Sequence, residues 1–202
     1  MRKLTIILWL CLWLQFSCAV KPLITNQYVL TTFSKKHSVN KCADHSILVN
    51  TPHALAGLNT NQMLYSTEPF VLNAFIHSAW VDPPAQMLLP LIIQSLEYSG
   101  CFAAITSNNN SSHTDYRIDT ELIELQQNFL SKPSRVNFVI EVTLTNVNAD
   151  HLIASRLFYY KVPCVSDTPY SGVIATNQAT QLFTQELTNF ITQHLDSRKQ
   201  SH

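Results

Sequence analysis

The sequence predicts an α+β fold in which a mostly antiparallel sheet packs against two main helices as a two-layer sandwich. Three observations predict it. Strand-like runs occupy both halves of the chain, a proline-initiated helix separates the two groups, and a long amphipathic helix comes last. With 202 residues and a hydrophobic fraction of 46%, the chain can bury one sizeable core, so we expect a single domain.

The first element, residues 1–17, has the pattern of an export signal peptide. Arg2 and Lys3 supply the basic start, and Leu4 to Leu14 form an apolar run. A membrane-spanning helix needs about 20 apolar residues, so this run is too short for a permanent span. We expect export followed by cleavage.

The cleavage site resembles the lipobox of bacterial lipoproteins, because the small residue Ser17 precedes Cys18. That motif favours Leu where this chain has Gln15. We expect Cys18 to be the lipid-bearing residue, acylated with palmitate, and residues 18–26 to form the lipidated N-terminus and tether. The alternative is ordinary cleavage near Ser17 or Ala19, with no lipid on Cys18.

Three cysteines remain in the mature chain once Cys11 leaves with the leader and Cys18 carries lipid. They are Cys42, Cys101 and Cys164. An odd number allows at most one internal disulfide, and the pairing stays open. Small buried thiols are the alternative, and no two of the three have the spacing of zinc ligands.

The domain, residues 27–195, begins with four strand-like runs and ends before a polar tail at 196–202. The runs are Tyr28–Leu30, Ser46–Asn50, Gln62–Ser66 and Phe70–Ser78, the last two joined at Thr67-Glu68-Pro69.

The central helix is predicted to start at Asp82-Pro83-Pro84, with Asp82 as the capping carboxylate and the prolines in the first turn. Apolar residues then recur at helical spacing until Ser99-Gly100. Pro90 removes one backbone hydrogen bond, so we expect a kink or a shortened start. A short strand over Cys101–Ile105 and an exposed hairpin loop over Ser107–Ser112 follow.

An antiparallel meander with one buried face is predicted next, because three long runs alternate and are separated by loops at 131–134 and 146–150. The alternating sets are Tyr116, Ile118, Thr120 and Leu122; Val136, Phe138, Ile140, Val142 and Leu144; and Ile153, Ser155, Leu157, Tyr159 and Lys161.

The closing helix carries an apolar stripe that should lie across the sheet. Its members are Ala175, Ala179, Leu182, Phe183, Leu187, Phe190, Ile191 and Leu195, with Thr176, Gln178, Gln185 and Thr188 on the other side.

No catalytic or metal site is predicted. The eight histidines show no paired ligand spacing, and the glycines Gly57, Gly100 and Gly172 are too scattered for a phosphate loop or a nucleophile elbow. Asp119 and Glu121 share a strand face, which we interpret as a solvated sheet face rather than an acid–base pair. We therefore expect neither enzymatic activity nor a cofactor. The 13 basic and 13 acidic side chains leave no basic field for nucleic acid.

Several segments in order resemble the auxiliary lipoproteins of ABC-type transport systems, of the paraquat-inducible type that accompanies MCE-domain lipid transporters. They are the lipoprotein leader, Trp80-Val81-Asp82-Pro83-Pro84 with the helix Ala85 to Leu96, Gly100-Cys101-Phe102, Leu122 to Phe129, the strand pair Val136 to Leu144 and Leu152 to Tyr159, and Ala175-Thr176-Asn177-Gln178-Ala179. The resemblance covers roughly residues 62–195, and the Cys42 segment departs from it.

The resemblance implies an outer-membrane lipoprotein that faces the periplasm and helps a multiprotein system move phospholipid or other hydrophobic molecules. It implies an MCE-domain tunnel protein and other transport subunits as partners, contact with the membrane through the N-terminal lipid, room for a homo-oligomer, and ATP hydrolysis on a separate subunit.

Two choices stay open. Trp80, Pro83 and Pro84 could form a partner interface, or Trp80 could be a buried residue at the start of the central helix. The alternative function is a soluble secreted binding protein that carries a small apolar ligand between helix and sheet.

Overall fold

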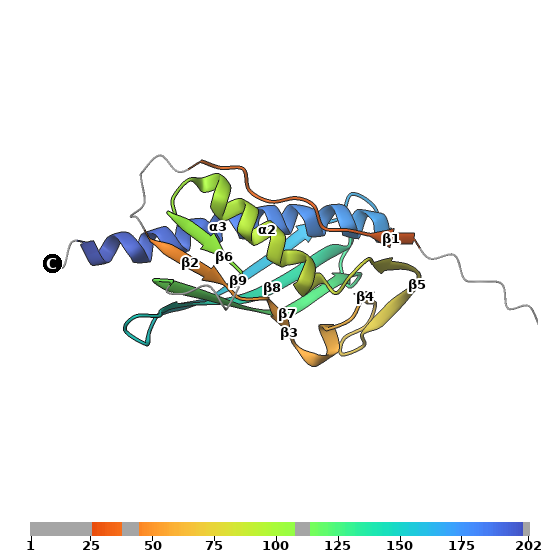
Figure 1. The fold of residues 1–202 in the computed structure, drawn as a ribbon. Helices are drawn as coiled ribbons and strands as arrows, with labels where there is room; N and C mark the ends of the chain where they lie inside the picture. The colour runs from red at the N-terminus through yellow and green to blue at the C-terminus, as the bar shows by residue number, and fades with distance from the viewer. Residues whose placement is uncertain (1–25, 38–44, 108–113, 200–202) are drawn as a thin grey trace, which may run out of the picture.

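Two helices cover one face of a nine-stranded mixed sheet (Figure 1). The computed structural model describes residues 26–37, 45–107 and 114–199, without the side chains of 196–199. Its strands are β1 (Asn26–Tyr28), β2 (Ser46–Val49), β3 (His53–Ala54), β4 (Gln62–Ser66), β5 (Asn73–Trp80), β6 (Ala104–Thr106), β7 (Tyr116–Asn128), β8 (Arg135–Asn146) and β9 (His151–Pro163). The helices are the 3₁₀ turn η1 (Ala56–Leu58), α2 (Pro84–Ser99) and α3 (Pro169–Lys199).

The α+β class and the two-layer arrangement are confirmed, but the prediction of a mostly antiparallel sheet is wrong. Among the described residues, five strand pairings are parallel and three are antiparallel. The physical reason is that one edge of β7 pairs in turn with β2, β3 and β4, all of which run in its own direction. Short strands of this kind carry too few residues for their direction to be read from alternation.

The region before β7 is not the predicted hairpin. β2 lies between β6 and β7 and is parallel to both, so β6 and β7 do not pair. Most of the predicted loop, residues 108–113, lies outside the described residues. A segment from the start of the domain therefore fills the position that a hairpin partner would take.

The predicted meander β7–β8–β9 is confirmed, with antiparallel pairing over nearly its whole length. Its buried face carries the predicted residues of β7 and β8, such as Ile118 and Phe138, both 0% exposed. On β9 the inward residues are Phe158, Tyr160 and Val162, whereas Leu157 and Tyr159 point to the open face. Both faces of β9 carry apolar residues, so alternation along the sequence does not show which face is buried.

The helix α2 spans the predicted range, but its N-cap is Pro83 and Asp82 makes no cap. Pro90 does not shorten it, since the helix already begins at Pro84. Gly100 ends it with φ 69°, a left-handed conformation that glycine adopts without the penalty of a Cβ atom.

The helix α3 packs its aromatic stripe on the sheet. The Phe183 ring lies edge-on to Phe138 and Phe158, with centroids 5.8 and 5.5 Å apart. The side predicted to be polar is partly covered, because Thr176 is buried together with Thr180 and Thr184. Their hydroxyls donate to carbonyls one turn back, which satisfies them inside the core.

The segment 29–37 runs over the helices as a strap (Figure 1). The backbone N–H groups of Thr31 and Thr32 donate to Asn177 Oδ1 at 2.9 and 3.1 Å, and that of Ser34 donates to Thr184 Oγ1 at 2.9 Å. The strap therefore ties the N-terminal part of the domain to α3. No helix of the described residues is long and apolar enough to cross a membrane.

Candidate functional site

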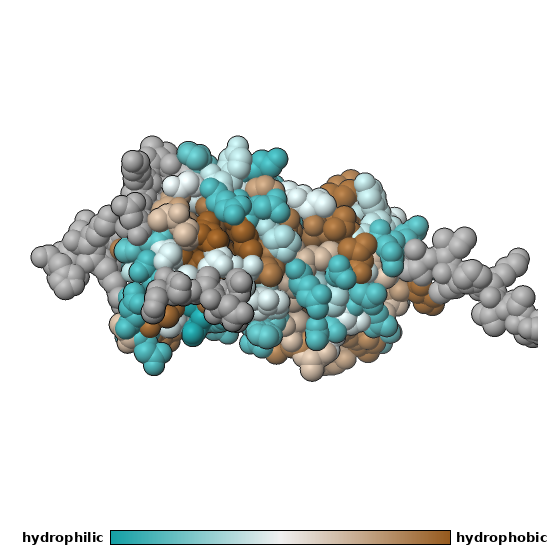
Figure 2. Space-filling view, viewed as in Figure 1, coloured by the Kyte–Doolittle hydropathy of each residue, from teal (hydrophilic) through white to brown (hydrophobic). Residues whose placement is uncertain are grey.

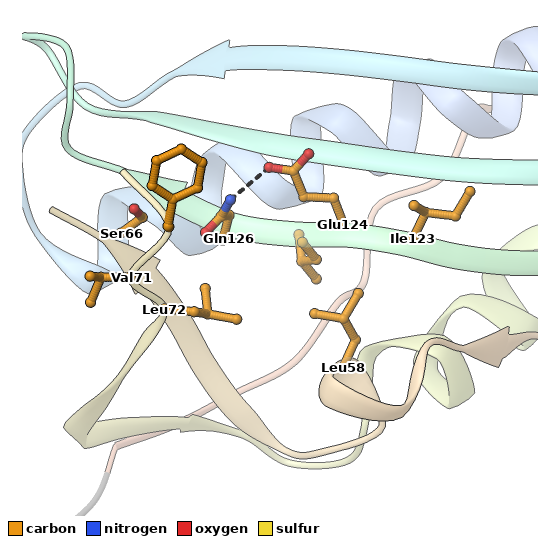
Figure 3. A pocket seen from close by; sticks show the side chains of 9 residues that line it. Leu58, Ser66, Val71, Leu72, Ile123, Glu124 and Gln126 are labelled. Atoms are coloured by element: carbon orange, nitrogen blue, oxygen red, sulfur yellow. Dashed lines mark hydrogen bonds between the residues drawn. The ribbon is translucent and has the colours of Figure 1, made fainter. Parts of the chain in front are cut away.

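A surface groove lies where the β4–β5 hairpin meets β7 (Figure 3). Its volume is about 280 Å³. The lining residues come from η1, the hairpin and β7, and are Leu58, Ser66, Phe70, Val71, Leu72, Ile123, Glu124, Leu125 and Gln126. The groove is thus apolar with one carboxylate and one amide, a composition typical of sites that bind an apolar group and orient it by a few polar contacts.

A β-bulge in β7 shapes the floor of the groove. Leu122 is opposite Ile140 and Glu124 is opposite Val139, so Ile123 is an extra residue between two paired positions. Leu122 and Leu125 both face the core as a result, and Ile123 and Glu124 are half-buried on the groove side. Strand periodicity breaks at this point, which is why alternation did not reveal the groove.

The carboxylate of Glu124 is held by two amide groups. Its Oε1 accepts hydrogen bonds from Gln126 Nε2 at 2.7 Å and from Asn137 Nδ2 at 2.8 Å. The Asn137 side chain is buried, and its Oδ1 has no partner among the described residues. These amides fix the position of the Glu124 carboxylate, which lines the groove and can accept further hydrogen bonds from a bound group.

An aromatic cluster fixes the hairpin against β7. The rings of Tyr65 and Phe75 stack with centroids 4.4 Å apart, and Phe129 lies edge-on to Tyr65 at 5.9 Å. The Phe129 N–H also donates to the Ser66 carbonyl at 2.8 Å. The walls formed by Val71 and Leu72 therefore rest on a rigid support.

Phe70, at the tip of the hairpin, is strained and exposed. Its φ is 67°, which is unusual for a residue with a Cβ atom, and its side chain is 108% exposed. A residue this exposed packs little against the rest of the chain, so Phe70 lines the groove at its outer rim.

The open face of the sheet continues from the groove as a surface of charged and apolar side chains. Glu121 lies directly opposite Glu141, and Glu141 lies opposite Leu157. Leu157 and Tyr159 are each about half exposed, at 55% and 51%. Neither α2 nor α3 covers this face (Figure 1).

Among the residues that line the groove, Glu124 is the one titratable side chain. Across residues 26–37, 45–107 and 114–199, no three His, Cys, Asp or Glu side chains gather in a way that could hold a metal ion. The groove has no cysteine, histidine or lysine in its lining. The arrangement suits binding.

Comparison with known proteins agrees with a transport role. The family model described as the ABC-type transport auxiliary lipoprotein component matches residues 28–188. The chain belongs to this family. It is therefore an auxiliary lipoprotein component of an ABC-type transport system. No curated protein matches the sequence.

Solved structures share the fold of this auxiliary lipoprotein. A Xanthomonas campestris protein of the DUF330 family has a TM-score of 0.79 at 18% identity, over 87% of this chain and 99% of that one. An uncharacterized protein has a TM-score of 0.68 at 15% identity, over 83% and 99%. A hypothetical Chlamydia trachomatis protein has a TM-score of 0.53 at 7% identity, over 76% and 98%. At these identities the likeness concerns the fold alone.

The structure describes only some of the residues predicted to form sites in the auxiliary lipoprotein. Cys18 and Cys42 lie outside the described residues. Trp80 is 3% exposed and Pro84 is buried, so the surface there consists of Val81, Asp82 and the half-buried Pro83. The partner interface at Trp80, Pro83 and Pro84 stays a prediction.

The structure shows whether two cysteines of this auxiliary lipoprotein are bonded or free. Cys101 is disulfide-bonded, while Cys164 is a free, buried thiol whose pKa is raised by burial.

Among the described histidines, His37 Nδ1 lies 2.8 Å from the Tyr98 carbonyl and His45 Nδ1 lies 4.0 Å from Asp115. Asp119 pairs with Arg117 at 2.9 Å, as expected for a solvated face.

Proposed function

We propose that this protein is an outer-membrane docking lipoprotein of an MCE-type lipid transport system. Acyl chains on Cys18 would hold it on the periplasmic face of the membrane, since the multiple chains of a bacterial lipoprotein anchor stably. The groove beside the β7 bulge would hold an apolar segment of a partner subunit, such as the MCE tunnel protein. The transported molecule would be phospholipid or another hydrophobic compound, with ATP hydrolysis on a separate subunit.

The observation that carries the docking role is the groove itself. Val71 and Leu72 form an exposed apolar wall, at 40% and 50% exposure, next to the oriented carboxylate of Glu124. A protruding apolar side chain with a neighbouring Lys, Arg or amide donor would match both features. The acidic pair Glu121 and Glu141 on the same face adds charge complementarity to a basic partner segment.

The alternative function, a secreted carrier with its ligand between helix and sheet, has little support from the helix–sheet interface. The cavity there, lined by Trp80, Val136 and Gly172 among others, has a volume of about 10 Å³, less than one small ligand needs. The space between the layers is filled by core side chains. We therefore favour a docking protein over a carrier.

The anchor is tested by intact mass. Mature protein from the bacterial membrane fraction should have lost residues 1–17 and gained acyl groups, and a Cys18→Ser variant should lack that added mass. Unmodified protein in the soluble fraction, starting near Ala19 or elsewhere, would contradict the anchor.

The docking groove is tested by photocrosslinking in the native bacterium. A photoreactive residue at Leu72 should crosslink to an MCE subunit, whereas one at Val147, in the turn at the opposite end of the sheet, should not. Leu72→Asp and Glu124→Gln should each weaken co-purification of that subunit without loss of acylation. Equal crosslinks at both positions, or unchanged co-purification, would rule out the groove as the docking site.

A further inference from the structure

Three connections and the start of a helix meet at one end of the sheet. The β4–β5 turn (67–72) is tied to β7 by the 2.8 Å hydrogen bond from Phe129 N–H to the Ser66 carbonyl. The β7–β8 turn (129–134) is tied to the β9–α3 connection (164–168) by the 2.8 Å bond from Cys164 N–H to the Ser134 carbonyl. The Ser134 N–H donates in turn to Asp167 Oδ1 at 2.9 Å. These connections therefore lie side by side.

Each connection exposes at least one large hydrophobic side chain, and α3 exposes another in its first turn. The most exposed in each segment are Phe70 at 108%, Leu130 at 51%, Val165 at 89% and Tyr170 at 59%; Val71 and Leu72 are exposed too and line the groove. Single exposed apolar residues are ordinary, but here four neighbouring segments each bring one to the same end of the sheet. Figure 2 shows hydrophobic residues at this end, interleaved with hydrophilic ones. We call these four residues the apolar end face.

The described chain also begins at this end of the molecule (Figure 1). Tyr28 of β1 lies against Tyr170 of α3, with ring centroids 6.1 Å apart. Eight residue steps separate Cys18 from Asn26, the first described residue, and an extended chain of that length spans at most about 29 Å. An acyl anchor on Cys18 would therefore keep the apolar end face close to the bilayer; this step rests on the proposed function.

Charge at this end is mixed. Lys132 lies in the β7–β8 turn, Glu68 lies in the β4–β5 turn, and Asp167 is engaged with Ser134. Contact with lipid here would be driven by apolar burial and not by attraction to anionic headgroups. The strained backbone of Phe70 fits this role, because it presents a phenyl ring that the fold itself does not use.

We propose that the apolar end face of Phe70, Leu130, Val165 and Tyr170 dips into the interface of the membrane to which the N-terminus is anchored. The domain would then be seated on the bilayer with a fixed orientation, and the open face of the sheet with its groove would stand upright toward the transport partner. The acyl chains supply attachment, and the end face supplies orientation.

Depth-dependent fluorescence quenching tests the orientation. The full mature chain would carry Phe70→Trp or, as the matched control at the opposite end of the sheet, Val147→Trp. Each would be reconstituted in vesicles of phosphatidylethanolamine and phosphatidylglycerol at about 3:1 that contain acyl-brominated phosphatidylcholine. Quenching at least about twofold greater for Phe70→Trp is expected, since buried Trp80 contributes equally to both. Equal quenching would overturn the proposal and leave the end face as a protein interface.

A second measurement separates the end face from the anchor. In the mature chain, residues 18–202, carrying Cys18→Ser, flotation with the same vesicles without brominated lipid reports the end face without acyl chains. Adding Phe70→Ser and Val165→Ser should lower the bound fraction by about tenfold, as expected for the loss of two partly inserted apolar side chains, while Val147→Ser should not. Unchanged flotation would overturn the end face even if the mass shows Cys18 acylated. If Cys18 is unmodified in the native protein but the Phe70→Ser and Val165→Ser changes still lower flotation strongly, the acyl anchor is contradicted and the end face stands.

Discussion

Gly172, in the first turns of α3, lies directly against the side chain of Gln127 on β7: a Cβ atom on Gly172 would come 2.5 Å from Gln127 Oε1. The Gln127 amide cannot move without breaking hydrogen bonds, because its Nε2 donates to Ser134 Oγ at 2.9 Å and to the Thr168 carbonyl at 3.3 Å. The contact places the N-terminal part of α3 on the end of the sheet that also carries the β7–β8 turn.

Gly172→Ala should therefore lower the free energy of unfolding by about 1 to 2 kcal/mol. The intrinsic gain of alanine over glycine inside a helix is only about 1 kcal/mol, and overpacking against a hydrogen-bonded, 3% exposed side chain costs more. Denaturant unfolding checks this value. The control is the double variant with Gln127→Ala, in which Gly172→Ala should become stabilising; a destabilisation of equal size there would show that Gln127 is not the cause.

The long elements of this fold could be predicted from the sequence because each carries enough residues for its period to be read. β8 and α3 are examples: Val136 to Leu144 alternate, and Ala179, Phe183, Leu187 and Ile191 recur at helical spacing. The parallel pairings of β2, β3 and β4 with β7 could not be predicted, since strands of two to five residues owe their direction to contacts with β7 and not to their own pattern.

The groove was missed for a related reason. It depends on the one extra residue of the β7 bulge, Ile123, and on the hairpin of β4 and β5, whose neighbours along the sheet are distant in sequence. The only local signal was the run Leu122-Ile123-Glu124-Leu125, where two apolar residues stand together in an otherwise alternating strand. In a strand whose side chains otherwise alternate between apolar and polar, that apolar pair indicates a bulge.

Glu121→Lys should raise the free energy of unfolding by about 0.5 kcal/mol. Glu121 is exposed and lies directly opposite Glu141, and like charges at such a cross-strand position repel, whereas a Lys–Glu pair attracts. Thermal unfolding at low ionic strength should show the gain, and added salt should reduce it. Glu121→Gln is the control and should give about half the effect. A loss of stability in the lysine variant would mean that the two carboxylates do not interact.

Asp115 should make the stability of the protein fall at acidic pH. Its carboxylate accepts hydrogen bonds from the Ser46 N–H and hydroxyl, both at 2.8 Å, and these bonds lower its pKa below the ordinary value of 3.8. A group whose pKa is lower in the folded state adds stability above its unfolded pKa and loses it as the pH falls through the folded one.

The test is the difference in unfolding free energy between the parent and Asp115→Asn across pH. At neutral pH the parent should be more stable by about 1 kcal/mol, a modest value because the Asp115 side chain is 38% exposed. The difference should shrink once the pH falls below 3.8. A difference that does not depend on pH would show that the ionised carboxylate is not what Ser46 binds.

One thiol should become reactive when the mature protein is unfolded without reductant. Cys101 is disulfide-bonded, and Cys164 is a free thiol, 3% exposed, whose pKa is raised by burial, so folding should shield it from thiol reagents. Cys164→Ala should abolish the remaining reactivity. Non-reducing peptide mapping should join Cys101 to Cys42, the one other cysteine that stays available if Cys11 leaves with the leader and Cys18 is acylated. A Cys42 thiol that reacts in unfolded, unreduced protein would contradict this pairing and would require Cys101 to bond elsewhere.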